Sequence, residues 1–129
     1  MLIKQLSVFL ENKPGTLEEA LKILKQAGIN IEALSLADTS EFGLLRVIVD
    51  DPDKAKAAMK AAGYTSSLNE VISAPLRQEV GSLSGIIQKI SSAGINVEYM
   101  YASSSSTSGA SMIIKTSDPA RAMEIISML

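Results

Sequence analysis

The sequence contains no cysteine and no histidine, and each absence removes a class of function. Without cysteine there is neither a disulfide framework nor a thiolate metal site. Without histidine and cysteine, the commonest general base and the most nucleophilic side chain are both missing. Fourteen carboxylates remain, but no apolar, paired setting marks any of them as a tuned acid or base. The sequence therefore predicts a protein that is not an enzyme and that uses no metal or cofactor.

Aromatic residues, basic clusters and long apolar runs are also scarce. The aromatic side chains (Phe9, Phe42, Tyr64, Tyr99 and Tyr101) form no array on which bases could stack. Twelve basic and fourteen acidic residues give a net charge of -2 without a basic cluster, which argues against a nucleic-acid partner. The N-terminus shows neither a long apolar run nor a signal-peptide pattern, so we expect a cytoplasmic protein without a membrane partner.

What the chain does contain is an internal repeat. The repeated segments, first copy before second, are 13–17 with 79–83, 27–32 with 93–98, and Asp51-Pro52 with Asp118-Pro119. The offset is 66 positions, and one residue is inserted before the last pair. Two copies are too few for a solenoid, so the repeat predicts two small domains in tandem. A groove between two similar domains is a natural place for a ligand.

Each copy predicts the same order of elements. Period-two alternation indicates strands, apolar residues at helical spacing indicate helices, and Asp-Pro marks a helix start. The predicted strands are Leu6–Leu10, Asn30–Ala37, Leu44–Val49 and Thr65–Leu68 in the first copy, and Ile72–Leu76, Asn96–Ser103 and Ser111–Lys115 in the second. The predicted helices are Leu17–Ala27 and Leu83–Ala93, closed by Gly28 and Gly94, and two helices that start at Pro52 and Pro119. Gly43 and Gly109 are expected in the turns before the third strands.

This order is βαββαβ, so we expect an α+β fold of two ferredoxin-like units, residues 1–68 and 69–129. Each unit is marginal alone, so we expect the two units to pair through their sheets and first helices. The second unit lacks its final strand, because the sequence stops at Leu129, the end of its last helix. Its sheet should then either receive a tail beyond this sequence or run with three strands and an unprotected edge.

The loop before the first helix carries a more specific signal. The run Glu11–Leu17, Glu-Asn-Lys-Pro-Gly-Thr-Leu, followed by Ala27–Ile31, resembles the ACT domain, a βαββαβ module that binds amino acids and regulates metabolic enzymes. Tyr99–Ala102, after Gly94–Glu98, further resembles stand-alone proteins built of two ACT domains in tandem. The resemblance covers nearly the whole chain. It implies that the two sheets pair side by side into one larger, continuous antiparallel sheet of eight strands with helices on one face. It also implies that the effector is held between the first loop of one domain and the second strand of its neighbour.

The residues of this loop suit a free amino acid. Gly15 lets the backbone approach a ligand, N–H groups at a helix start favour a carboxylate, and the Asn12 amide both donates and accepts. Asn30 and Asn96 follow the helix-ending glycines, where a neighbouring domain's loop could arrive. The predicted ligand-binding residues are Asn12, Lys13, Gly15, Thr16, Leu17, Asn96 and Val97. Ordinary turn chemistry is the alternative explanation for any one of these Asn and Gly residues.

A second ligand site would use the other copy of the loop. Its residues would be Gln78, Gly81, Ser82, Leu83, Asn30 and Ile31. This copy is degraded, because Gln78, Glu79 and Val80 stand where the first copy has Asn12, Lys13 and Pro14. A glutamate beside a bound carboxylate would repel it, so we expect the first loop, with Asn96, to bind better.

These observations predict a regulatory or sensor protein that holds a free amino acid, as effector, at the interface between its two ACT-like domains and has no catalytic activity. Two alternatives stay open, a ligand-free protein–protein interaction module and a regulatory subunit of an amino-acid biosynthetic enzyme. A small enzyme is a third class, which the lack of a general base disfavours. Because strands such as Ile31–Leu36 and Tyr99–Ala102 are apolar on both faces, we expect a homodimer or a larger assembly.

Overall fold

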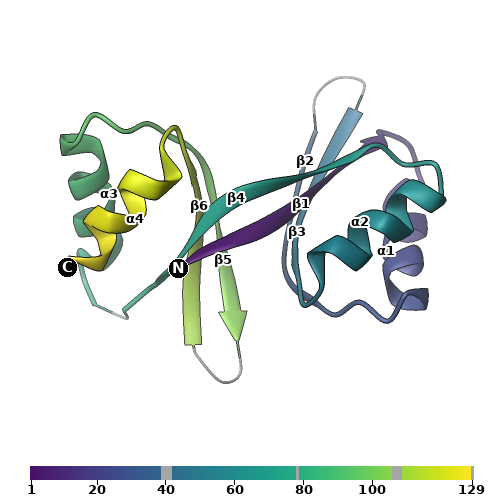
Figure 1. Cartoon of the computed structure of the whole chain (residues 1–129), viewed down its shortest axis with the longest axis horizontal. Coiled ribbons are helices and arrows are strands. Elements are labelled where there is room, and N and C mark those ends of the chain that lie inside the picture. The colour runs from purple at the N-terminus through teal and green to yellow at the C-terminus, as the bar shows by residue number, and fades with distance from the viewer. Residues whose placement is uncertain (39–41, 78, 106–108, 129) are drawn as a thin grey trace. The chain divides into compact units, whose positions relative to one another are not determined.

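The computed structural model describes residues 1–38, 42–77, 79–105 and 109–128. Its elements are β1 (Leu2–Glu11), α1 (Thr16–Gln26), β2 (Ile31–Asp38), β3 (Phe42–Val49), α2 (Pro52–Ala61), β4 (Ser66–Pro75), α3 (Ser82–Ser92), β5 (Val97–Ser105), β6 (Gly109–Thr116) and α4 (Pro119–Ser127) (Figure 1). The order of elements that the repeat predicts is therefore confirmed.

The helices begin and end where the sequence signals place them. The Asp51 carboxylate accepts a hydrogen bond from the Lys54 N–H at 3.2 Å, and Asp118 accepts one from the Arg121 N–H at the same distance. A proline at the first helical position follows each of these caps. Gly28 and Gly94 follow α1 and α3 with φ of 73° and 77°, the left-handed conformation that glycine adopts cheaply. No helix within the described ranges is long and apolar enough to cross a membrane.

The two glycines that were expected in turns before the third strands occupy different positions in their strands. Gly109 is the first residue of β6 and has a φ of 75°. Gly43 instead lies inside β3, opposite Leu10 of β1 and Asp38 of β2. The turn predicted at Gly43 is wrong, because β3 already pairs with β1 from Phe42 onward, opposite Glu11.

The first compact unit comprises Lys4–Asn69. Its strands are hydrogen-bonded in the order β2-β3-β1-β4. Alternate residues of β1 (Leu6, Val8 and Leu10) lie in one core cluster with residues of both α1 and α2. The two helices therefore cover one face of this sheet, as the βαββαβ arrangement requires. The fully buried core side chains are Leu6, Val8, Ala20, Leu24, Leu45, Val47, Ala55 and Met59.

The second compact unit comprises Met1–Ile3 together with Glu70–Leu129. Its core cluster joins Ile72, Ala74, Met112 and Ile114 of the strands to Ile86 and Ile90 of α3 and Ala122 of α4. Among the described residues no strand follows α4. The start of β1 stands at that position, since the Ser73 N–H donates to the Met1 carbonyl at 2.8 Å and the N-terminal ammonium donates to the Ser73 carbonyl at 3.1 Å.

The N-terminal residues thus take the place of the missing final strand of the second unit. In the second unit β4 pairs with β6 on one side and with Met1 on the other, so it does not have the unprotected edge that the sequence suggested. Leu2 packs against the core of this unit. A ten-residue strand at ~3.3 Å per residue is long enough to contribute to both units.

The strands form one six-stranded antiparallel sheet, in the order β2-β3-β1-β4-β6-β5, which confirms the expected single larger sheet. Six strands replace the eight that the resemblance implied, because β4 runs unbroken where two separate strands were predicted and because no strand follows α4 among the described residues. Residues 68–72 contain no proline or glycine that would end a strand. Since β1 and β4 contribute residues to both units, the domain limits 1–68 and 69–129 stay a prediction.

One hydroxyl in the second core lacks a partner. Thr116 is fully buried at the end of β6, and its Oγ1 atom has no hydrogen-bond partner in the described part of the chain. Thr116 lies opposite Val97, just as Val49 of the first copy lies opposite Ile31. The repeat therefore places valine and threonine at equivalent core positions.

We expect Thr116→Val to raise the free energy of unfolding by about 1 kcal/mol, because it removes a buried hydroxyl without a hydrogen bond at nearly constant shape. Urea unfolding measures the change. The reciprocal variant Val49→Thr is the matched control and should lower the free energy of unfolding. A Thr116→Val protein less stable than the wild type would show that the hydroxyl has a partner in solution.

Candidate functional site

The loop between β1 and α1 is held by hydrogen bonds of its own. The Lys13 N–H donates to the Glu11 carbonyl at 2.9 Å, and the Thr16 N–H makes a longer bond of 3.5 Å to the Lys13 carbonyl. The Thr16 hydroxyl lies 2.8 Å from the Glu11 carbonyl and 2.7 Å from the Lys13 carbonyl, and Thr16 is buried. Gly15 has a φ of 91°. The Thr16 side chain therefore closes the loop. The part of Thr16 that was predicted to bind a ligand is its backbone, at the start of the helix.

The loop before α3 repeats this geometry. The Glu79 N–H donates to the Arg77 carbonyl at 2.9 Å, and the Ser82 N–H donates to the Glu79 carbonyl at 3.2 Å. Gly81 has a φ of 85°, close to that of Gly15. Of the predicted second site, Gly81, Ser82 and Leu83 form this helix start, whereas Gln78 lies outside the described residues. The two loops therefore share a backbone and differ in their side chains.

The two kinds of helix start differ in how their N–H groups are satisfied. Asp51 and Asp118 cap α2 and α4 with their carboxylates. Gly15 and Gly81 stand at the N-caps of α1 and α3 and have no side chain to donate or accept. The first N–H groups of an uncapped helix favour an anion, both as donors and through the helix dipole. The repeated loops are thus the places where a ligand carboxylate would be bound.

A hollow of about 400 Å³ lies beside the first loop. Its lining residues are Phe9, Leu10, Glu11, Lys13, Thr16, Glu19, Phe42, Ala62, Gly63, Tyr64 and Thr65. Of the predicted ligand-binding residues, Lys13 and Thr16 line this hollow. Asn12, Gly15 and Leu17 belong to the same loop and helix start but do not line it, and Asn12 is exposed.

The charged side chains that line this hollow are the ion pair of Lys13 with Glu11 and one further carboxylate, Glu19. Lys13 Nζ lies 3.0 Å from Glu11 Oε2, and the hydrogen bond to Glu11 raises the pKa of Lys13. Burial raises the pKa of Tyr64, and the neighbouring Glu19 carboxylate raises it further. Phe9 and Phe42 add exposed aromatic surface. The hollow offers carboxylates to an ammonium group, while the uncapped helix start beside it offers N–H groups to a carboxylate.

The predicted strand residues lie far from the loop of their own unit. Asn30 and Ile31 follow the end of α1, whereas the loop precedes its start, and an eleven-residue helix is about 16 Å long. Asn96 and Val97 follow α3 in the same way. A site that joins the Asn12–Leu17 loop to Asn96 draws on two units, and it stays a prediction.

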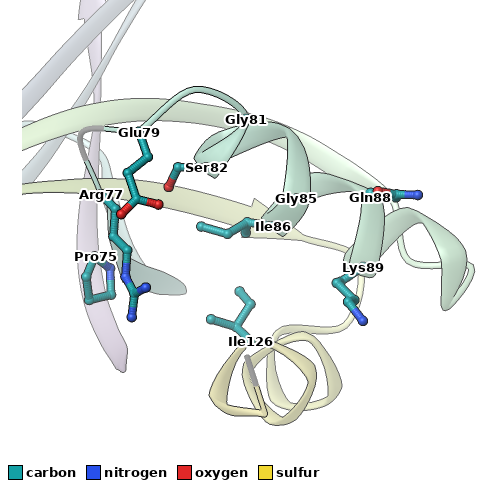
Figure 2. Close-up of a pocket in the computed structure, with 10 residues that line it drawn as sticks. All are labelled: Pro75, Arg77, Glu79, Gly81, Ser82, Gly85, Ile86, Gln88, Lys89 and Ile126. Atoms are coloured by element: carbon teal, nitrogen blue, oxygen red, sulfur yellow. The ribbon is translucent and has the colours of Figure 1, made fainter.

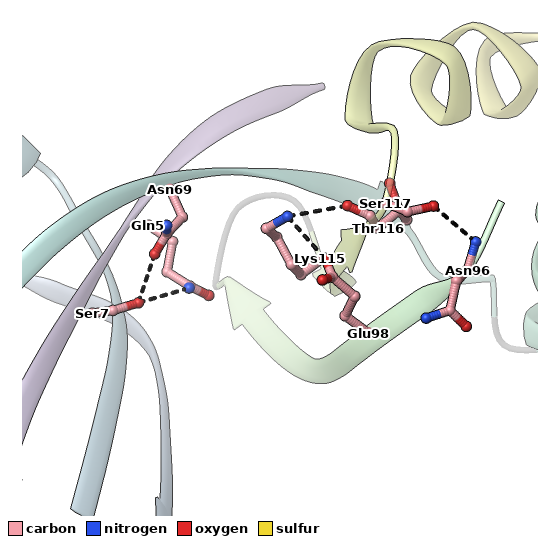
Figure 3. Close-up of polar contacts among 8 residues, drawn as sticks. All are labelled: Gln5, Ser7, Asn69, Asn96, Glu98, Lys115, Thr116 and Ser117. Atoms are coloured by element: carbon pink, nitrogen blue, oxygen red, sulfur yellow. Dashed lines mark hydrogen bonds and ion pairs between the residues drawn. The ribbon is translucent and has the colours of Figure 1, made fainter.

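Asn30 and Asn96 each already make a backbone hydrogen bond within the fold. The Asn30 N–H donates to the Asp50 carboxylate at 3.0 Å. The Asn96 N–H donates to the Ser117 hydroxyl, also at 3.0 Å (Figure 3). Both bonds come from the backbone, so neither uses the exposed side-chain amide. The side chains of Ile31 and Val97 pack against the cores of their units. At Ile31 and Val97, therefore, the backbone is the part that could contact a ligand.

A larger hollow lies beside the second loop, and we name it the α3–α4 groove. It has a volume of about 500 Å³ and is lined by Pro75, Arg77, Glu79, Gly81, Ser82, Gly85, Ile86, Gln88, Lys89 and Ile126 (Figure 2). Sequence reasoning placed Gly81 and Ser82 in the second site and considered Glu79 as a charge beside it, and it missed the other lining residues. Gly85, near the start of the predicted helix Leu83–Ala93, was the signal that could have pointed to the groove.

Comparison with known proteins places the fold in a family. A family model of the ACT domain pair matches residues 1–129. Protein BT0572 from Bacteroides thetaiotaomicron is 35% identical, with a TM-score of 0.90, over 99% of this chain and 88% of that one. A comparison with curated proteins found no match.

More distant structures share the fold. The regulatory subunit of aspartate kinase from Thermus thermophilus, in its ligand-free form, is 17% identical with a TM-score of 0.67. The corresponding subunit from Thermus flavus is 18% identical with a TM-score of 0.64. In both cases the likeness covers 99% of this chain and 94% of the other.

The family model spans the whole chain and supports a ligand-binding regulatory role. Sequence motif, βαββαβ units and family model all agree. This chain belongs to the ACT domain pair family.

Proposed function

We propose that this protein is a cytoplasmic regulator that binds a free amino acid and has no catalytic activity of its own. The observation that carries the proposal is the uncapped start of α1 behind Gly15, beside a hollow of about 400 Å³. The helix starts with a side-chain cap, at Asp51 and Asp118, offer no comparable set of N–H donors. Membership of the ACT domain pair family supports the interpretation that α1 lacks a side-chain cap because a ligand binds at its start.

The loop supplies both groups that an amino acid needs. The N–H groups of Gly15, Thr16 and Leu17 would receive the carboxylate. The Asn12 amide oxygen or the Glu19 carboxylate, which lines the hollow, would receive the ammonium. Recognition of this kind needs no reactive side chain, in keeping with a sequence that has neither histidine nor cysteine. Asn96 of the other unit is part of the proposed site as a further amide.

The regulated partner is proposed to be a metabolic enzyme. Two of the proteins that share this fold are regulatory subunits of aspartate kinase, which makes an enzyme of amino-acid biosynthesis a partner to test. The likeness is one of fold, so the enzyme itself is a matter for experiment.

A second candidate function is a protein–protein interaction module, and exposed apolar side chains favour it. Phe9, Leu34, Leu36 and Phe42, all in the first unit, are between 42% and 52% exposed. Phe9 lies opposite Leu44 and Phe42 opposite Glu11, so both aromatic side chains are on the sheet face away from α1 and α2. Leu34 and Leu36 lie opposite Val47 and Leu45 of the core, and therefore belong to the face that carries the helices. We propose that a second copy of the chain covers the face of Phe9 and Phe42 in a homodimer, and a monomer mass by light scattering would contradict that.

A thermal-shift screen with the twenty common amino acids tests the proposed function. A ligand at ~100 times its dissociation constant stabilises the native state by about 2.7 kcal/mol. We expect one amino acid, or a few related ones, to raise the melting temperature. If none does, the interaction module becomes the better explanation.

Asn12→Ala then tests the loop. Hydrogen bonds to charged groups contribute about 1.5–3 kcal/mol each, so we expect the selected amino acid to bind at least about tenfold more weakly in calorimetric titration. The fold should keep its stability, because Asn12 is exposed. Equal affinities of Asn12→Ala and wild type would place the site elsewhere.

A further inference from the structure

The amino group of Met1 bridges β4 and α4 of the second unit. It donates to the Ser73 carbonyl at 3.1 Å and lies 2.9 Å from the thioether sulfur of Met123, Sδ. The Ser73 N–H donates in turn to the Met1 carbonyl at 2.8 Å. Met123 also packs against the core cluster of this unit, as Leu2 does. One side chain of α4 therefore contacts both the start of β1 and the core.

The internal repeat shows that the sulfur at this place is particular to the second copy. Asp51 and Asp118 are equivalent helix caps, so Met123 corresponds to Lys56, which stands equally far along its helix. Lys56 is exposed, and a lysine at position 123 would place a second ammonium against that of Met1. A thioether is uncharged and only a weak hydrogen-bond acceptor. A chemical change at the sulfur therefore alters the contact with the ammonium.

The methionines of the chain differ in how far an oxidant can reach them. Met59 and Met112 are 0% and 7% exposed and are shielded inside the two cores. Met128, at the other extreme, is 81% exposed. Met123 lies between these extremes, because its side chain is half-buried and its contact with Met1 is at the surface. Oxidant can reach its sulfur, and the product changes the surroundings of a side chain that the fold uses.

Oxidation of Met123 does not fit the observed contact. The sulfur lone pair forms an S–O bond to hydrogen peroxide, the O–O bond breaks, and the leaving hydroxide takes the remaining proton to give water and a sulfoxide. The sulfur loses the two electrons that reduce the peroxide. An ammonium–oxygen hydrogen bond alone spans about 2.7–2.9 Å, which is the whole distance from the Met1 nitrogen to Sδ. A sulfoxide oxygen directed at the ammonium therefore displaces it from the Ser73 carbonyl, and one directed inward places a polar atom against the core.

We propose that Met123 is an oxidation-sensitive switch, which keeps the start of β1 on the second unit as long as its sulfur is a thioether. The sulfoxide separates Met1 from Ser73, withdraws Leu2 from the core and exposes the edge of β4. Hydrogen peroxide is the signal, and enzymatic reduction of the sulfoxide reverses the change. The inference is independent of the proposed function, because none of these residues belongs to the proposed amino-acid site.

Treatment of the full chain with hydrogen peroxide tests the switch. Peptide mass spectrometry follows the conversion of Met123, and hydrogen exchange of the Ser73 amide, measured by NMR, reports its bond to Met1. We expect the Ser73 amide to exchange at least about tenfold faster once Met123 is converted, and methionine sulfoxide reductases to restore the slow exchange. Unchanged exchange of Ser73 in protein whose Met123 is fully converted overturns the switch. Met123 that stays unmodified while Met128 is fully oxidised overturns it too.

Met123→Leu is the oxidation-resistant variant. Leucine and methionine have similar volumes, so this change should keep the fold. After peroxide treatment the Ser73 amide of Met123→Leu should exchange as slowly as before treatment. Met128→Leu, the matched control, removes an exposed sulfur and keeps Met123, so its response to peroxide should equal that of wild type. Faster exchange of Ser73 in treated Met123→Leu would assign the effect to another methionine and overturn the proposal.

Met123→Gln gives a second measurement that needs no oxidant. Its amide places a polar group where the sulfur lies, as the sulfoxide does, so we expect the Ser73 amide to exchange faster than in wild type. Met128→Gln places the same side chain at an exposed position and should leave the exchange of Ser73 unchanged. Slow exchange of Ser73 in Met123→Gln would show that the contact tolerates a polar group, and it would contradict the switch.

Discussion

Residues 69–129 expressed alone are expected to show no cooperative unfolding transition at the melting temperature of the full chain. This fragment lacks Met1–Ile3, which belong to its compact unit and pair with Ser73. It also loses Leu2 from its core and exposes the edge of β4. A unit of this size buries too little surface to tolerate such losses.

The unfolding transition is measured by circular dichroism as a function of temperature. The full chain under the same conditions is the reference. The complementary fragment, residues 1–68, keeps nearly all of Lys4–Asn69 but ends β4 after its first residues. We expect it to melt at a lower temperature than the full chain. A cooperative transition of either fragment at the full-length temperature would show that the unit is independent.

Leu24→Ala is expected to lower the free energy of unfolding by about 3 kcal/mol, within the range for large-to-small changes in a core. Leu24 is fully buried in the first core between α1 and the sheet. Ile90 occupies the equivalent place in α3 and is also fully buried, so Ile90→Ala should cost a similar amount. Denaturant unfolding measures both changes.

Lys22→Ala is the control for this pair, because Lys22 lies exposed on the same helix as Leu24. Surface changes of this kind stay within about 0.5 kcal/mol. A loss below about 1 kcal/mol in Leu24→Ala or Ile90→Ala would mean that the corresponding cavity collapses or fills with solvent.

The local parts of the fold could be predicted because their signals are local. The Asp-Pro helix starts, the glycines that end α1 and α3, and the alternation of Leu6, Val8 and Leu10 each act within a few residues. The repeat then supplied the topology, since it gave the same order of elements twice.

The use of the N-terminus could not be predicted in this way. The hydrogen bond between the N-terminal ammonium and the Ser73 carbonyl spans 72 positions. No pattern near either residue specifies such a pairing, because any extended strand offers the same backbone groups. The continuous β4 could have been anticipated, since no residue that breaks strands separates its two halves.

The positions of the two candidate loops could be predicted from the sequence, whereas the residues that line the neighbouring hollows could not. Glycine, proline and the repeat mark the two loops, and neither helix start that follows them has a side-chain cap. The hollows depend on residues that are distant in sequence, such as Tyr64 in the first and Ile126 in the second.

Two-dimensional amide NMR spectra of isotope-labelled protein, titrated with the amino acid that the thermal screen selects, test the central claim most directly. The account predicts saturable shifts centred on the amides of Gly15, Thr16 and Leu17, because these N–H groups would bind the carboxylate. Spectra that stay unchanged with every amino acid would contradict the claim that this ACT domain pair is an amino-acid-binding regulator.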